Sequence, residues 1–315
     1  MDLRRSRYVL VAVLAALLVL GWAAVPAQAT FPGPNGKVVF TSLYLSRPQI
    51  YTMGFHGANK TRMTNPPRQN FSPSWNWDST RIVFITIPPS GTSQIFMMNA
   101  IGSLRTQITT GTRSYDTPAM SPNGKKIVAM GWNKPGDYRN LYLARADGSG
   151  TRRFTKVPAD DSAPAWSPDG TKIAWTRLSS NGKYDIFVMN TDGTGFKRLT
   201  GGSGSAGDPC WSPDGTKIVY TYVTGTKPST KTGRLWTMDA NGANKTRLTA
   251  NMVGSMYVNA SWSPAGDKIA FIREADPAHT EPDVMTVNYP GGGGQDNLTS
   301  QRFHPSDVAW GSSPV

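Results

Sequence analysis

The chain has 315 residues, and 33 Lys and Arg against 20 Asp and Glu give it a formal net charge of +13. Its 32 Gly, 24 Pro and ten Trp argue against a helical bundle or a disordered chain and favour many short strands joined by turns. Cys210 is the only cysteine in the sequence, which excludes an internal disulfide.

Residues 1–29 have the pattern of a secretory signal peptide. Three arginines precede an apolar run at 9–20, and "AQA" at 27–29 supplies small residues for cleavage. The alternative is an uncleaved anchor, because the apolar run extended to Val25 is long enough to cross a bilayer. We favour cleavage, which predicts an exported protein in the periplasm, the cell envelope or the extracellular space.

The charge of the exported part limits its partners. Cleavage removes three of the 33 basic and one of the 20 acidic side chains, which leaves 30 against 19 and a net charge of +11. Such a surface attracts nucleic acid, anionic lipid or acidic polysaccharide. Export argues against nucleic acid. No second long apolar run follows, so we expect no stable membrane insertion after cleavage, and we expect a monomer.

A repeated motif dominates the remaining sequence. "SPDGTKIAWTR" at 167–177 returns as "SPDGTKIVYTY" at 212–222. The sequence contains six copies of the repeat, each marked by a glycine seven residues before a closing threonine. Successive glycines are 45 to 50 residues apart. The glycines are Gly57, Gly102, Gly148, Gly193, Gly242 and Gly292, and the threonines are Thr64, Thr109, Thr155, Thr200, Thr249 and Thr299. This period indicates a repeat architecture.

Each copy predicts four antiparallel strands, A to D. In the fourth copy these are 163–166, 172–177, 185–190 and 196–200. The Pro-Asp-Gly turn joins A to B, and the recurring glycine supplies the positive φ that a tight C–D turn requires. Strands B and C are apolar on both faces, as expected for sheets packed between neighbouring sheets. Four short strands per copy are typical of a propeller blade.

The two ends of the sequence predict how the ring closes. The first copy begins near its strand B, and the final residues contain a strand A with nothing after it. We therefore predict an all-β, six-bladed β-propeller over 30–315, closed by the C-terminal strand in the first blade. The predicted blades are 36–64 with 306–311, 72–109, 117–155, 163–200, 208–249 and 259–299.

The stretch "WSPDGTKIAW…DIFVMNTDGTGFKRLT" at 166–200 resembles the TolB-type, WD-repeat-like propeller unit. The resemblance recurs in every blade and implies a secreted or periplasmic bacterial propeller. It covers protein-binding modules, gates fused to serine peptidases, and occasional lyases or hydrolases. TolB carries an N-terminal α/β domain that we expect to be missing here, which argues against a Tol–Pal translocation role.

The sequence offers no convincing catalytic, cofactor or metal motif. "GSGSAG" at 202–207 has dinucleotide spacing, but a strand rather than a helix follows it. A G-x-S-x-G elbow is missing, which excludes a fused peptidase. His56, His279 and His304 fall at different places in their blades, so we expect no metal site. We predict no catalytic residues and no cofactor.

The basic residues gather at the start of strand B and along strand D. Those on strand D, the outer edge of each blade, prevent edge-to-edge association without any ligand, and those that open strand B are expected to be solvated. The strand B residues are Lys37, Arg81, Lys126, Lys172, Lys217 and Lys268.

The D–A and B–C connections share one face of the predicted propeller and carry its long loops, the usual place for recognition. One side of this face is basic and the sixth-blade side is acidic, which suits a protein partner. The predicted partner-binding residues are Lys134, Arg139, Lys227, Lys231, Arg234, Glu274, Asp276, Glu281 and Asp283.

The D–A loops also place polar residues around the mouth of the central channel. These are Asn70, Tyr115, Asp116, Asp160, Asp161, Tyr257 and His304. They are suited to bind a peptide terminus or a sugar, although Asp and Asn also serve simply to cap turns.

Two functions therefore remain open. The first is a non-catalytic binding module or scaffold that uses the long-loop face. The second is a carbohydrate-active or other hydrolase or lyase whose acid and base are carboxylates such as Asp116 and Asp161.

Overall fold

A computed structural model describes residues 33–76, 78–88, 91–225, 232–250, 256–274, 281–299 and 303–312. The predicted signal peptide lies outside these ranges. All regular structure in them is β-strand. No helix among the described residues is long and apolar enough to cross a membrane.

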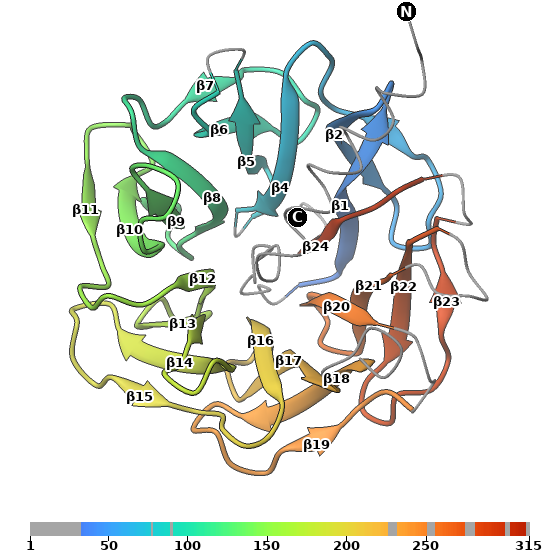
Figure 1. The fold of residues 1–315 in the computed structure, drawn as a ribbon. Helices are drawn as coiled ribbons and strands as arrows, with labels where there is room; N and C mark the ends of the chain where they lie inside the picture. The colour runs from blue at the N-terminus through green and yellow to red at the C-terminus, as the bar shows by residue number, and fades with distance from the viewer. Residues whose placement is uncertain are drawn as a thin grey trace, which may run out of the picture.

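Six four-stranded antiparallel sheets radiate from one axis (Figure 1). Blades one to three, each given from the innermost to the outermost strand, are β24 (Asp307–Ser312), β1 (Asn35–Tyr44), β2 (Arg47–Met53), β3 (Thr61–Arg62); β4 (Gln69–Trp75), β5 (Arg81–Ile87), β6 (Gln94–Asn99), β7 (Thr106–Gln107); and β8 (Ser114–Met120), β9 (Lys126–Trp132), β10 (Asn140–Arg145), β11 (Thr151–Arg153). Blades four to six are β12 (Asp161–Trp166), β13 (Lys172–Leu178), β14 (Tyr184–Asn190), β15 (Lys197–Arg198); β16 (Ser205–Trp211), β17 (Lys217–Thr224), β18 (Thr232–Asp239), β19 (Thr246–Arg247); and β20 (Tyr257–Trp262), β21 (Lys268–Arg273), β22 (Asp283–Asn288), β23 (Asp296–Asn297).

The C-terminal strand closes the ring, as the sequence predicted. β24 pairs with β1 from Asn35↔Ser312 to Thr41↔Asp307, with one irregularity between Asn35 and Val38. Trp310 is buried against blade six, in a cluster that joins the last blade to the first. The fold is therefore the predicted all-β propeller with six blades of four strands.

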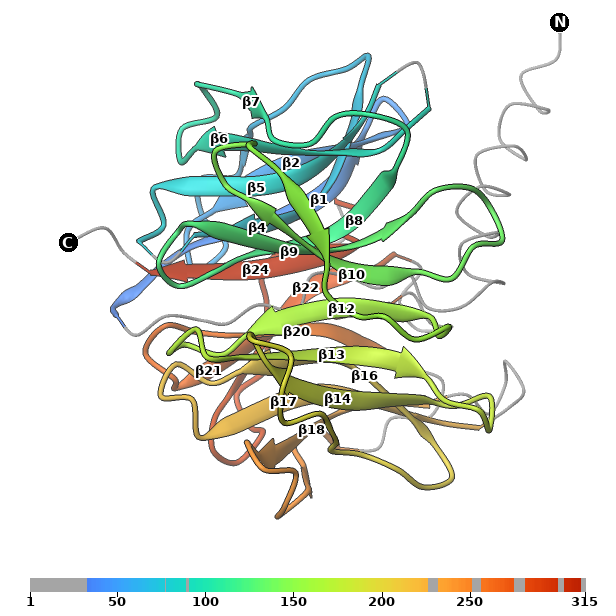
Figure 2. The same ribbon diagram turned by 90° about the vertical axis from the view of Figure 1, so that its left-hand side faces the viewer.

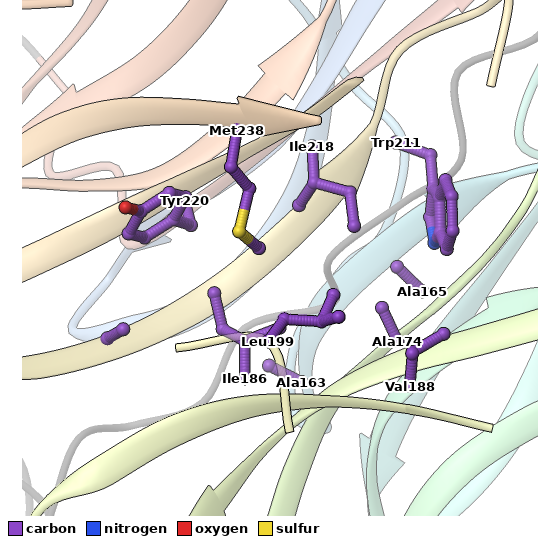
Figure 3. Packing of buried hydrophobic residues seen from close by; sticks show 11 residues of the cluster. Ala163, Ala165, Ala174, Ile186, Val188, Leu199, Trp211, Ile218, Tyr220 and Met238 are labelled. Carbon is purple, nitrogen blue, oxygen red and sulfur yellow. The ribbon is translucent and has the colours of Figure 1, made fainter. Parts of the chain in front are cut away.

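The hydrophobic core is divided among the interfaces between adjacent blades. Among the described residues, six buried clusters are found, one at each interface between blades. In the cluster between blades four and five, Trp211 lies opposite Ala165 and Val188 of blade four (Figure 3). The neighbour of Trp211 in the strand, Cys210, is fully buried and packs toward blade six. Each blade is thus stabilised from both sides, because it buries one apolar face against each neighbour.

The closing threonine has the same role in all six blades. In blade four the Ile186 amide donates to Thr200 Oγ1 at 2.8 Å, and the Leu199 amide donates to the Ile186 carbonyl. Equivalent bonds reach Thr64, Thr109, Thr155, Thr249 and Thr299. Strand D is shorter than the predicted 196–200, spanning only Lys197–Arg198, because the threonine hydroxyl takes the place of a backbone carbonyl at the end of the ladder.

The connections divide the ring into two faces (Figure 2). The D–A and B–C connections lie on one, here the loop face, at the right in Figure 2. The A–B and C–D turns lie on the other, the turn face. The A–B turns are fixed by side chains: Ser167 Oγ donates to Asp169 and accepts from the Lys172 amide, and Ser212 does the same in blade five.

Candidate functional site

The innermost strands surround the axis, and five of them contain a bulge near the loop face. In β4, β8, β12, β16 and β20 the pairing with strand B shifts register, and the residue at the shift has a positive φ. These residues are Ser72, Thr117, Ala163, Asp208 and Asn259. A non-glycine residue in this region is strained, and bulges re-aim side chains next to functional sites. The bulged ring is therefore the candidate site.

Two carboxylates in this ring are connected through one serine. Ser72 Oγ donates to Asp116 Oδ1 at 2.9 Å, and the Ser72 amide donates to Asp307 Oδ2 at 3.3 Å. Burial raises the pKa of each carboxyl to about 6, although hydrogen bonds from Ser72 and Thr117 oppose this at Asp116. The negative charge of Asp307 adds to the increase at Asp116. Blades one, two and three thus share an acidic contact.

Asp208, in the bulge of blade five, is the most perturbed of these carboxylates. It is only 3% exposed, and no described group donates a hydrogen bond to its side chain. Burial raises its pKa to about 7, with a further contribution from the charge of Glu274. Its backbone amide donates to Thr176 Oγ1 of blade four at 3.0 Å. The main chain is therefore satisfied while the carboxyl has no hydrogen-bonding partner in the described part of the chain.

Because these pKa values are raised, the native protein binds more protons than the unfolded chain between about pH 4 and pH 7. The free energy of unfolding should therefore fall as the pH rises through this window. Replacing Asp208 by Asn removes one of these contributions. In the parent, the free energy of unfolding is expected to be lower at pH 8 than at pH 4.5. We expect Asp208→Asn to reduce this difference by about 2–4 kcal/mol, measured by denaturant unfolding at the two pH values.

Asp192→Asn is the matched control, because Thr194 holds the pKa of that exposed carboxyl below its usual range. A lowered pKa stabilises the folded state by a constant amount above about pH 4, so the loss of Asp192 should leave the slope between pH 4.5 and pH 8 unchanged. An unchanged slope between pH 4.5 and pH 8 in Asp208→Asn would contradict the assignment.

Two other predicted channel-mouth residues are buried and already have partners inside the propeller. Asn70 is buried, accepts from Thr86 Oγ1 and donates to Gln49 Oε1. Tyr115 is buried edge-on against Tyr142, with ring centroids 6.1 Å apart.

Asp161 is fully buried and lies in an ion pair inside blade four. Arg177 Nε and Nη2 donate to its two oxygens at 2.6 and 2.8 Å, and Trp175 Nε1 donates at 2.9 Å. Asp116 is instead bonded to Ser72 and coupled to Asp307, so the structure pairs Asp116 with a different carboxylate from the one in the sequence-based hypothesis.

The loop residues and the mouth residues, predicted as two separate sets, contact one another. His304 Nδ1 lies 2.6 Å from Glu281 Oε2. The Arg139 amide donates to Asp160 Oδ1 at 2.9 Å.

A third contact of this kind joins blades five and six, where the guanidinium of Arg234 stacks over the Tyr257 ring at 5.4 Å from its centroid. The two predicted sets therefore contact each other at three places in the described part of the chain.

The remaining predicted loop residues differ in exposure. Lys134 is exposed at the tip of the β9–β10 connection. Glu274 is partly buried, and Asp283 is fully buried against Arg273 at 2.6 Å. Lys227, Lys231 and Asp276 lie outside the described residues.

Among the described residues, no three His, Cys, Asp or Glu side chains come together in an arrangement that would hold a metal ion. The bulged ring contains instead the buried carboxyl of Asp208 and the linked pair of Asp116 and Asp307.

Sequence reasoning missed Asp208 and Asp307. Both stand two positions before the small residue that precedes the repeated Trp, at Cys210 and Ala309. Aligning the six copies at this position would have shown that only two carry a carboxylate there. The bulge that aims Asp208 was not visible in the pattern.

The comparisons with known proteins agree with this geometry. Residues 24–155 and 136–306 match the model of the TolB beta propeller domain. A TolB homolog from Chlorobium luteolum is 31% identical over 156 residues, which cover 50% of this chain and 34% of that protein. The matched part is thus about a third of the length of that relative.

Two solved structures show the same architecture. TolB from Acinetobacter baumannii aligns with a TM-score of 0.73 at 19% identity, over 88% of this chain and 67% of that chain. An oligogalacturonate lyase in complex with manganese aligns with a TM-score of 0.55 at 14% identity, over 86% of this chain and 74% of that one. At these identities the likeness concerns the fold alone.

Proposed function

The chain belongs to the TolB β-propeller family, and from this premise we propose that it is an exported, non-catalytic module that binds a protein partner through its loop face. The observation that supports this most directly is the mixed character of that face. Exposed cations and apolar side chains occur at blades three and four, whereas the blade six loops and the bulged ring are acidic. Such separated charges orient a protein partner.

We propose that the strongest binding contacts lie at blades three and four. Tyr138 is 56% exposed beside Arg139, and Val157 is 44% exposed on the next D–A connection. The Asp161 amide donates to the Arg139 carbonyl, so these two connections are tied together by the backbone. Tyr and Arg are the residue types that most often dominate the energy of protein interfaces, particularly where a rigid framework presents them.

Tyr138→Ala is expected to weaken binding of the partner by about 10- to 30-fold. The partner is first captured from an envelope extract of the source organism by crosslinking to the full chain. Its affinity for purified protein is then measured by titration. Ile101→Ala is the matched control, because Ile101 is a comparably exposed apolar residue on the turn face. Equal loss in both variants would overturn the loop-face assignment.

A turnover assay on the same purified protein tests the carboxylate enzyme hypothesis. Purified protein is incubated with a panel of polysaccharides and esters, and Asp116→Asn is measured beside it. We expect no turnover from either. Turnover that disappears in Asp116→Asn would replace the binding module with a hydrolase or lyase that uses the Asp116–Asp307 pair.

A further inference from the structure

A basic cavity lies on the turn face between blades two and three, away from the candidate site. It has a volume of about 500 Å³ and is lined by Arg81 of blade two and by Lys125, Lys126 and Arg145 of blade three. Gly124, Ala146 and Asp147 complete its wall. Four cations and one carboxylate give this wall a charge of +3. We call it the basic turn pocket.

Two of the four cations stand directly opposite each other in the β9–β10 ladder, where Arg145 pairs with Lys126. Like charges in this arrangement destabilise a sheet. The other blades that form this cross-strand pair avoid the repulsion. Their pairs are Arg81↔Asn99, Lys172↔Asn190, Lys217↔Asp239 and Lys268↔Asn288.

Blade five has a carboxylate instead of a second cation at the same position. Lys217 Nζ lies 2.5 Å from Asp239 Oδ1, an ion pair across the ladder. Blade three has the same ladder register but a second cation, so a negative charge from elsewhere would stabilise its pair.

The described surroundings of the pocket supply this charge only in part, since Asp147 is the single carboxylate of the lining and its charge interacts with that of Arg145. Asp147 is held in its own turn, where the Ser149 amide donates to Oδ1 at 2.9 Å. The A–B turn carries Asn123 and Lys125 where blade four carries Asp169 and Thr171. None of the four cations forms an ion pair with a described carboxylate.

We propose that the basic turn pocket binds a multiply charged oxyanion of the phosphate type. The planar guanidinium groups of Arg81 and Arg145 can each donate hydrogen bonds to two oxygens at once. Lys125 and Lys126 act as point charges. A bound dianion or trianion neutralises the Lys126–Arg145 repulsion. The cavity is larger than one orthophosphate needs, so a diphosphate or a phosphorylated group on a larger molecule fits it better. The site is independent of the loop face and of the proposed protein partner.

The test is the melting temperature of the full chain at constant ionic strength, in chloride and with increasing pyrophosphate. We expect a saturable increase of about 3–6 °C once pyrophosphate exceeds its Kd about 100-fold. Arg145→Asp copies the blade five pair. This variant should melt about 1–2 °C above the parent in chloride and lose the pyrophosphate response.

Arg152→Asp is the control, since it makes the same charge change on the outer strand of blade three but does not line the pocket. It should keep the response. A second arm measures binding to vesicles that contain phosphatidic acid, whose phosphomonoester can carry two negative charges, against vesicles of phosphatidylcholine alone. Binding lost in Arg145→Asp, without a pyrophosphate effect, identifies a lipid headgroup as the source of the phosphate. The proposal is overturned if neither probe distinguishes the parent from Arg145→Asp, or if Arg152→Asp loses the response equally.

Discussion

A chain that ends at Thr299, and so lacks β24, is expected to melt at least about 10 °C below the full chain or to fail to fold. Val308, Ala309 and Trp310 are each no more than 3% exposed, and they contribute to the clusters on both sides of blade one. Burying one large apolar side chain is worth about 1.5–3 kcal/mol. The truncation also leaves the inner edge of β1 without a partner, which invites association.

The measurement is thermal unfolding followed by circular dichroism, with the full chain beside the truncated one. A synthetic peptide of residues 303–312 serves as the control, because it restores β24 without restoring chain connectivity. We expect the peptide to recover most of the lost melting temperature. Equal melting of the two chains without peptide would show that closure by β24 contributes nothing to stability.

Arg177→Met is expected to destabilise the protein by about 3–5 kcal/mol, because it leaves the buried Asp161 carboxylate without its partner. The pair is bidentate, and Asp161 is 0% exposed. Burial raises the pKa of Asp161 even with Arg177 opposing this effect, so the variant raises it further. The penalty should therefore be full at alkaline pH and shrink as the pH falls through the folded pKa.

Denaturant unfolding at pH 5 and pH 8 measures both the loss and its pH dependence. Lys217→Met removes one partner of the solvent-exposed pair with Asp239 and is expected to cost little. Asp161→Asn combined with Arg177→Met should recover part of the stability, because no uncompensated charge is then buried. A pH-independent loss in the single variant would indicate that packing of the arginine, rather than its charge, is what matters.

Repetition made the fold predictable from the sequence. The recurring Gly and Thr gave the number of blades, and the unpaired strand at 306–311 gave the mode of closure, because both depend on local patterns. The role of the threonine was not predictable. Its hydroxyl accepts from an amide 14 or 15 residues earlier in the chain, as from Ile186 to Thr200, and no local pattern reports such a contact.

The candidate site was only partly predictable. Sequence position placed Asp116 and Asp161 in the D–A connections of neighbouring blades, but their environments depend on partners from other strands. Asp161 has an arginine directly opposite in β13, whereas Asp116 reaches a serine of blade two. The importance of Asp208 follows from a bulge and from the packing of the next blade. Both are tertiary features.

Because Asn35 pairs with Ser312, the same ring of blades could be built by a chain that begins at another blade. The first and last described strands are neighbours in one sheet, so a short linker between them would make the backbone a closed loop. New ends opened at an A–B turn such as Pro168–Gly170 would then keep all six interfaces. The propeller is in this sense a circularly permutable ring, in which the position of the chain break is separable from the architecture.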